Sequence, residues 1–249
     1  MDETFLLRPD WPAPGRVRAL VTTRGGGVSR GPYASLNLGA HVGDDPQAVA
    51  CNRELLSAML PSAPAWLDQV HGTDVIELSE RGWADGSPCA DAAIARRAGE
   101  VCVVMTADCL PVLLCDQSAS VVAAAHAGWR GLAAGILERT VRQMGVAPSR
   151  LMAWMGPAIG PGAFEVGPEV REVFIAEDGD AAGAFVPRNG DRWLADLYQL
   201  AQRRLLRAGV GQVFGGGRCT WSDPERFYSF RRERVTGRFA SLVWLDPDG

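Results

Sequence analysis

Several features that mark membrane, exported and nucleic-acid-binding proteins are missing from this sequence. No stretch approaches the roughly 18 uninterrupted apolar residues that a membrane-spanning helix needs. Residues 1–5 are acidic and do not form a cationic segment followed by an apolar one, so we expect no signal peptide. The net charge is −4 and there is no long charge run, which argues against a dedicated nucleic-acid binder. We therefore expect a cytoplasmic monomer that works without a membrane or a nucleic-acid partner.

The six cysteines lack the spacing of a compact metal-binding or disulfide framework. No two of them form a CxxC pair, and Cys102, Cys109 and Cys115 lie in or beside hydrophobic runs. In a chain without an export signal, buried free thiols with one functional thiol among them are expected rather than disulfides.

The composition is that of a globular protein. Apolar residues make up 47% of the chain and charged residues 22%, and 249 residues suffice for one large domain. Strand-like and helix-like segments follow one another without strict βαβ alternation, so we predict a single α/β domain over residues 1–249, with mixed β-sheets flanked by helices. The predicted strands are 17–24, 66–71, 74–78, 101–106, 112–115, 120–126, 151–155, 213–214 and 239–244. The predicted helices are 46–59, with Asp45 as its N-cap, then 92–98, 131–144, 168–176 and 196–208.

Histidine is scarce, and the sequence has only His41, His71 and His126. His71 and His126 each stand where a predicted strand ends and a glycine-containing loop begins, and Cys109 lies at the break between two apolar strands. Strand ends are where the sites of α/β proteins gather. Two imidazoles and one thiolate make a ligand set for a catalytic zinc with one coordination position open. If these three side chains converge, we expect an enzyme.

Spacing alone leaves two other interpretations open. The three residues are 38 and 17 positions apart, which is not a compact zinc-finger pattern. In the first alternative, both histidines are hydrogen-bonded strand-end residues and Cys109 is a small core side chain. In the second, Cys109 is a nucleophile that His126 activates without any metal.

Other polar side chains are candidates for binding substrate or for supporting the ligands. Arg24 and Arg130 are candidate anion-binding groups, since Arg130 stands at the start of a predicted helix. Asp74 and Asp108 neighbour the candidate ligands, where either could accept a hydrogen bond from an imidazole N–H. His41 fits a pocket wall better than a fourth ligand position.

A late segment, residues 228–238, combines arginines and hydroxyls in a pattern suited to phosphate or a sugar, and Arg231 lies within it. The complete set of candidate substrate-binding residues is Arg24, Asn37, His41, Arg130 and Arg231.

A series of short blocks runs in order along nearly the whole chain. They are TTRGGGVS (22–29), PYASLNLG (32–39), HVGDD (41–45), QVHG (69–72), ADCLP (107–111), HAGWRG (126–131), GPAIGP (156–161), FEV (164–166), YSFRR (228–232) and TGR (236–238). Taken together, these blocks resemble the family variously called multicopper polyphenol oxidase (laccase) domain, YfiH-like or peptidoglycan editing factor proteins.

The resemblance implies the α/β fold that this family shares with a bacterial deamidating toxin, and a zinc site on His71, Cys109 and His126. It also implies activity on purine nucleosides: phosphorolysis of adenosine, inosine or S-methyl-5′-thioadenosine, and deamination of adenosine. The older laccase label implies copper. Three histidines are too few for a multicopper oxidase, so copper is disfavoured.

We therefore predict a zinc-dependent purine nucleoside phosphorylase and adenosine deaminase whose partners are a nucleoside and phosphate. Arg24, Arg130 and Arg231 are the candidates to hold the phosphate. Two alternatives stay open. One is a cysteine hydrolase or amidase that edits peptidoglycan precursors with Cys109 and His126 as a dyad, and the other is a non-enzymatic partner of cell-wall synthesis with a vestigial site.

Overall fold

The computed structural model describes residues 5–78 and 86–248. Residues 1–4, on which the expectation about a signal peptide partly rests, lie outside this range. Within the described residues, no helix has the length and apolar character required to span a bilayer.

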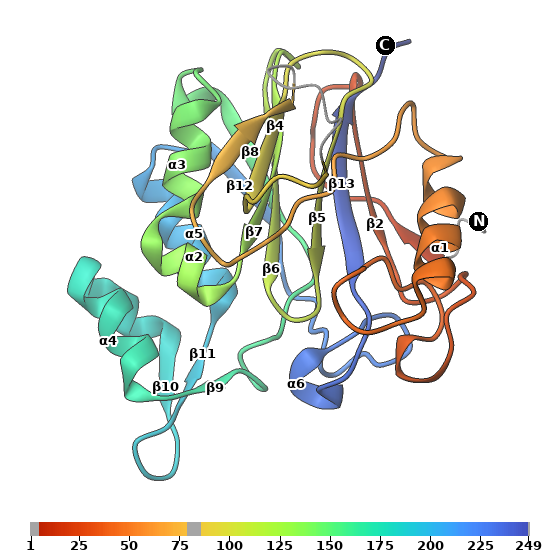
Figure 1. Cartoon of the computed structure of the whole chain (residues 1–249). Helices are drawn as coiled ribbons and strands as arrows, with labels where there is room; N and C mark the ends of the chain where they lie inside the picture. The colour runs from red at the N-terminus through yellow and green to blue at the C-terminus, as the bar shows by residue number, and fades with distance from the viewer. Residues whose placement is uncertain (1–4, 79–85, 249) are drawn as a thin grey trace.

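Two β-sheets form the centre of the molecule, and helices lie on their outer faces (Figure 1). The larger sheet is mixed and contains β12 (Gln212–Gly215), β8 (Leu151–Met155), β6 (Leu110–Asp116), β7 (Val122–Ala127), β4 (Ala92–Ala95) and β3 (Val75–Glu77), in that order. The second sheet is antiparallel and contains β1 (Leu6–Leu7), β2 (Val17–Thr22), β13 (Phe239–Leu245) and β5 (Val101–Thr106). A small third sheet contains β10 (Phe185–Pro187), β11 (Trp193–Ala195) and β9 (Glu165–Val166). The predicted α/β fold with mixed sheets is confirmed.

The helices complete the layers. The α-helices are α1 (Pro46–Ser57), α2 (Trp129–Ala134), α3 (Ile136–Gln143), α4 (Pro168–Glu177), α5 (Leu197–Arg207) and α6 (Phe230–Glu233). Shorter 3₁₀ turns are η2 (Gly31–Tyr33), η4 (Pro148–Arg150) and η5 (Gly179–Ala184). As predicted, Asp45 caps α1, because its side chain accepts a hydrogen bond from the Gln47 amide.

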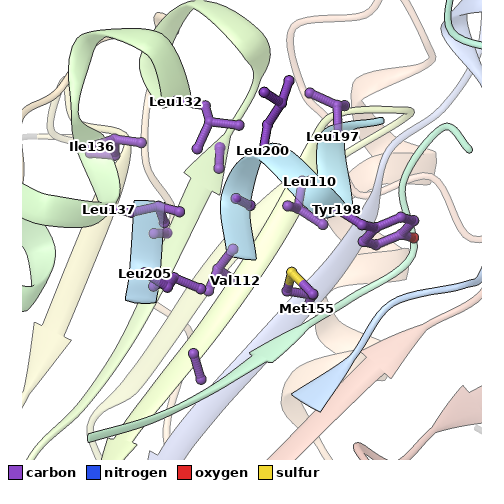
Figure 2. Close-up of a cluster of buried hydrophobic side chains, with 14 of the residues drawn as sticks. Leu110, Val112, Leu132, Ile136, Leu137, Met155, Leu197, Tyr198, Leu200 and Leu205 are labelled. Carbon is purple, nitrogen blue, oxygen red and sulfur yellow. The ribbon is translucent and has the colours of Figure 1, made fainter. Parts of the chain in front are cut away.

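Three apolar layers hold the fold together. The first lies between the larger sheet and helices α2, α3 and α5, where Leu132, Ile136, Leu200 and Leu205 pack on β6 and β8 (Figure 2). The second lies between the two sheets, and the third lies between the antiparallel sheet and α1. Strands β5, β6, β7 and β8 are buried along their whole length because both of their faces are covered.

Three predicted elements were wrong. Residues 92–98 were expected to form a helix, but Ala92–Ala95 form strand β4, which pairs with β7 and β3 and is fully buried. Pairing on both sides overrides the helix propensity of this alanine-rich segment. Residues 66–71 form no strand and contribute only an isolated bridge between Asp68 and Cys89. The helix expected over 131–144 is two helices, because Gly135 adopts a left-handed conformation with φ 95° and ends α2.

The candidate site lies where the chain passes from the antiparallel sheet to the larger sheet. β5 ends at Thr106 in the antiparallel sheet, and β6 starts at Leu110 in the larger sheet. Cys109 therefore lies on the short segment that joins the sheets. β6 and β7 are antiparallel, with Leu110 opposite Ala127, so the end of β7 and residue His126 lie beside this crossing.

Candidate metal centre

His71, Cys109 and His126 converge in the structure. One donor atom from each lies within 4.8 Å of the other two, and the Cys109 Sγ is 3.5 Å from the His71 Nε2. The two imidazole rings meet edge to face, with their centroids 4.7 Å apart. His126 is buried, Cys109 is half-buried and His71 is exposed, so the group opens toward solvent on one side.

A buried carboxylate, Asp91, orients the His126 imidazole and holds the backbone turn that carries His71. Its Oδ1 lies 2.8 Å from the His126 Nδ1, and the backbone amide of His126 donates to the Asp91 carbonyl at 2.7 Å. An ionised carboxylate only accepts hydrogen bonds, so Nδ1 carries the proton and a neutral imidazole keeps its lone pair on Nε2. The same carboxylate accepts the backbone N–H groups of Val70, His71 and Gly72 at 3.3, 2.9 and 2.6 Å. These bonds hold the turn in which His71 has a left-handed φ of 61°.

Gly128 leaves the centre of the group free of protein atoms. A Cβ at this position would lie 2.7 Å from the His71 Cδ2, closer than such atoms approach, and 3.0 Å from the Cys109 Sγ, tighter than most such contacts. Any side chain here would therefore push the ligand residues apart.

The donor set fits a zinc ion. Two imidazole nitrogens and one thiolate are zinc ligands, the oriented His126 has the outer-sphere carboxylate typical of such sites, and no fourth protein ligand joins them among the described residues. Three protein ligands leave one coordination position for water or substrate.

The electrostatics of the group favour a thiolate. Burial alone would raise the pKa of the Cys109 thiol, but the charge of His126 and hydrogen bonds with both imidazoles outweigh it and lower this pKa to about 6. Burial opposes the positive charge of His126, but Cys109 and Asp91 together raise the pKa of this imidazole. The thiolate and the imidazolium stabilise each other when no cation lies between them.

The thiolate–imidazolium pair of Cys109 and His126 predicts how the reactivity of Cys109 depends on pH in the metal-free protein. Iodoacetamide should alkylate Cys109 at a rate that declines only as the pH falls through about 6, whereas an ordinary thiol loses reactivity below about 8.5. Peptide mass mapping of the alkylated protein over a pH series would measure this rate, and the Cys109→Ala variant identifies the signal. A rate that follows the ordinary thiol profile would contradict the assigned electrostatics.

The group lies in the lining of a cavity of about 410 Å³. Of the five predicted substrate-binding residues, His41, Arg130 and Arg231 line this cavity. The remaining two, Arg24 and Asn37, are not among its lining residues and bond elsewhere. Arg24 pairs with Glu233 at 2.9 Å, and the buried Asn37 bonds to Asp44 at 2.9 Å.

Neither predicted acceptor for an imidazole has that role. Asp74 is exposed and pairs with Arg139 at 3.2 Å. Asp108, with a left-handed φ of 97°, accepts the Thr220 hydroxyl and the Arg231 backbone N–H, both at 2.6 Å. Asp108 therefore ties the Cys109 segment to α6 instead of orienting a ligand.

The sequence prediction missed the supporting carboxylate and part of the cavity wall. Asp91 was missed because residues 92–98 were expected to form a helix. Without a strand there, nothing indicated that Asp91 lies opposite His126. The wall also includes the apolar side chains of Ile159, Phe164 and Phe230 and the guanidinium of Arg238. Arg238 belongs to the late segment 228–238 that the sequence marked as suited to phosphate or a sugar, but it was not among the predicted substrate-binding residues.

The stacked sheets, and a cavity lined by two imidazoles and a thiolate, define an α/β protein with a candidate metal centre. The model of the multi-copper polyphenol oxidoreductase laccase family matches residues 18–246. A protein named purine nucleoside phosphorylase from Pseudomonas aeruginosa is 60% identical over 242 residues, which cover 96% of this chain and 98% of that protein. The purine nucleoside phosphorylase YfiH of Escherichia coli is 56% identical over 242 residues, with the same coverage of 96% and 98%. The chain belongs to this laccase-like family, as its sequence blocks predicted.

Solved structures give the same assignment. A DUF152-family protein of Neisseria meningitidis superposes with a TM-score of 0.94 at 51% identity, covering 97% of this chain and 99% of that one. YlmD from Geobacillus stearothermophilus superposes with a TM-score of 0.92 at 32% identity, covering 99% and 98%.

Proposed function

We propose that this chain is a zinc-dependent purine nucleoside enzyme, which phosphorolyses adenosine, inosine and S-methyl-5′-thioadenosine and deaminates adenosine. The observation that carries the proposal is the convergence of three donor atoms within 4.8 Å of one another in a cavity of about 410 Å³. The names of the relatives support the substrate class, since proteins 60% and 56% identical to this chain are named purine nucleoside phosphorylases.

His71, Cys109 and His126 would hold the zinc, which supplies Lewis-acid chemistry when bound. The low number of histidines favours zinc over the copper of the family's description. Asp91 keeps the ligand geometry fixed during turnover by holding the His126 ring and the His71 turn.

The cavity wall has side chains suited to both substrates, the purine nucleoside and phosphate. Ile159, Phe164 and Phe230 offer apolar and aromatic surface to a purine base. Arg130 and Arg231 bring positive charge for phosphate. In phosphorolysis a phosphate oxygen bonds to C1′ of the ribose while the C1′–N9 bond breaks, and the base leaves with a proton. In deamination water replaces the 6-amino group, which leaves as ammonia.

Turnover on defined nucleosides tests this function. The zinc-loaded protein should convert adenosine and phosphate to adenine and ribose 1-phosphate, and adenosine alone to inosine, both resolved by liquid chromatography. Metal analysis of the same sample should give about one zinc per chain. If neither adenine nor inosine accumulates with a fully loaded site, the nucleoside function is wrong.

A second candidate is a cysteine hydrolase or amidase that acts on peptidoglycan precursors. The mutual stabilisation of the Cys109 thiolate and the His126 imidazolium in the metal-free protein favours this candidate, since such a pair is an activated nucleophile. Chelation separates the two functions. A chelator should abolish turnover of nucleosides, whereas it should raise activity on an amide substrate if the thiol is the nucleophile. Loss of both activities would favour a non-enzymatic role.

A further inference from the structure

None of the three arginines that line the cavity, Arg130, Arg231 and Arg238, forms an ion pair among the described residues. Arg238 lines the cavity, is half-buried and has no carboxylate within ion-pair distance among the described residues. The only acidic side chain in the lining is Asp108, and both of its carboxylate oxygens already accept hydrogen bonds from Thr220 and Arg231. The charges of Cys109 and Asp108 favour the charged form of Arg238, but in the described part of the chain neither side chain accepts a hydrogen bond from its guanidinium.

The fold fixes Arg238 in place from several sides. Its Nη1 donates to the carbonyls of Thr236 and Gly237 at 3.1 and 3.0 Å, and its backbone N–H donates to the Asn37 Oδ1 at 2.9 Å. Gly39 makes room for its stem, because a Cβ there would lie 2.8 Å from the Arg238 Cγ. Among the described residues, the Nε and Nη2 nitrogens have no hydrogen-bond acceptor.

The other candidate arginines differ from Arg238 in their partners or in their burial. Arg24 lies outside the lining and pairs with Glu233. The Nη1 of Arg231 donates to the Glu165 carbonyl at 2.7 Å, and its guanidinium lies 5.5 Å from the centre of the Phe164 ring. Arg130 is exposed and lies over the Trp129 ring, so it is the least constrained of the set.

We propose that Arg238 is the main phosphate-binding residue of this cavity, presenting its free Nε and Nη2 to two phosphate oxygens. The proposal rests on the phosphorolytic function proposed above. A guanidinium fork matches two oxygens of a phosphate, and a half-buried guanidinium with two free donor nitrogens gains more from such an anion than an exposed one. Burial and the charge of Arg238 lower the pKa of the neighbouring His41, so this imidazole is neutral at neutral pH and adds no competing charge.

The primary test measures phosphate binding directly. Titration calorimetry of inorganic phosphate into the zinc-loaded protein should show binding that the Arg238→Gln variant weakens about 10- to 100-fold. The KM for phosphate should rise by the same factor, with little change in the KM for inosine. Arg30→Gln is the matched control, because Arg30 is exposed and outside the cavity lining, and it should bind phosphate like the wild type.

The Arg238→Lys variant gives a second readout that does not depend on activity. The sequence contains no lysine, so this variant carries the only ε-amine in the chain. Phosphate should protect that amine from an amine-reactive reagent, as located by peptide mass mapping, and phosphate affinity should lie between the wild type and Arg238→Gln. If the Arg238→Gln variant does not fold, the Arg238→Lys variant tests the proposal on its own.

The outcomes separate this proposal from the proposed function. Phosphate binding that depends on Arg238, without any turnover of nucleosides, would support the phosphate subsite and remove the nucleoside function. Phosphorolysis with an unchanged phosphate affinity in Arg238→Gln would overturn the subsite alone. A wild-type protein that binds no phosphate, or an ε-amine that phosphate leaves unprotected, would overturn it as well.

Discussion

The Cys109→Ala variant is expected to lose its bound zinc and nearly all turnover of purine nucleosides. The substitution removes the thiolate from the donor set, in which the Cys109 Sγ lies 3.5 Å from the His71 Nε2. A Lewis acid contributes several kcal/mol to transition-state stabilisation, so its loss should lower the rate by about 10³-fold or more. Metal content by mass spectrometry and initial rates, measured on the same preparation, check this result.

The Cys51→Ala variant is the matched control for that measurement. Cys51 is also a half-buried free thiol, but it lies on α1 and outside the donor group. It should keep the zinc content and the rate of the wild type. A Cys109→Ala protein with full turnover would contradict the assigned centre, and one that keeps its zinc but loses turnover would favour the thiol nucleophile.

Two of the donor residues, Cys109 and His126, could be predicted to meet because they lie at the adjoining ends of two paired strands. The sequence predicted the strands that became β6 and β7, and two consecutive antiparallel strands bring the start of one beside the end of the other. Cys109 and His126 therefore meet through a local hairpin. His71 reaches them without a strand of its own, since its segment is held by hydrogen bonds to Asp91.

The residues that the sequence did not reveal depend on long-range pairing. Asp91 lies opposite His126 only because β4 pairs with β7, and Arg238 lies in the cavity wall because β13 pairs with β5, with Phe239 opposite Thr106. The local pattern of a strand does not say which distant strand it pairs with. Arg24 and Asn37, which were also predicted to bind substrate, do not line the cavity, and their side chains bond within the fold.

The prediction that the cysteines are free thiols needed no knowledge of the fold. All six cysteines are free thiols, as the missing CxxC spacing indicated. Burial raises the pKa of Cys102 and Cys115, so these two thiols stay protonated and belong to the core. Cys109 differs from them because two imidazoles face its sulfur.

The Asp91→Asn variant is expected to bind zinc about 10- to 100-fold more weakly and to lose about 2–4 kcal/mol of stability. The Asp91 carboxylate is fully buried and accepts four hydrogen bonds, from His126 Nδ1 and from the amides of Val70, His71 and Gly72. An asparagine amide group would place N–H donors against the donors that now face an oxygen. Zinc competition titration and thermal unfolding measure the two effects separately.

The Asp74→Asn variant controls for the loss of one negative charge in Asp91→Asn. A pH series tests whether the charge of Asp91 is what stabilises the protein. Asp74 is exposed and pairs with Arg139 at the surface, so its substitution should leave zinc affinity and stability nearly unchanged. Burial alone would raise the pKa of Asp91, but its hydrogen bond with His126, the charge of His126 and two backbone amides lower it. A carboxyl group whose pKa is lowered by folding stabilises the protein above its unfolded pKa of about 3.9. The stability difference between wild type and Asp91→Asn should therefore be full at neutral pH and shrink as the pH falls below that value. A difference that does not depend on pH would mean that Asp91 acts through its shape alone, and equal zinc affinity in the two proteins would show that it does not position the ligands.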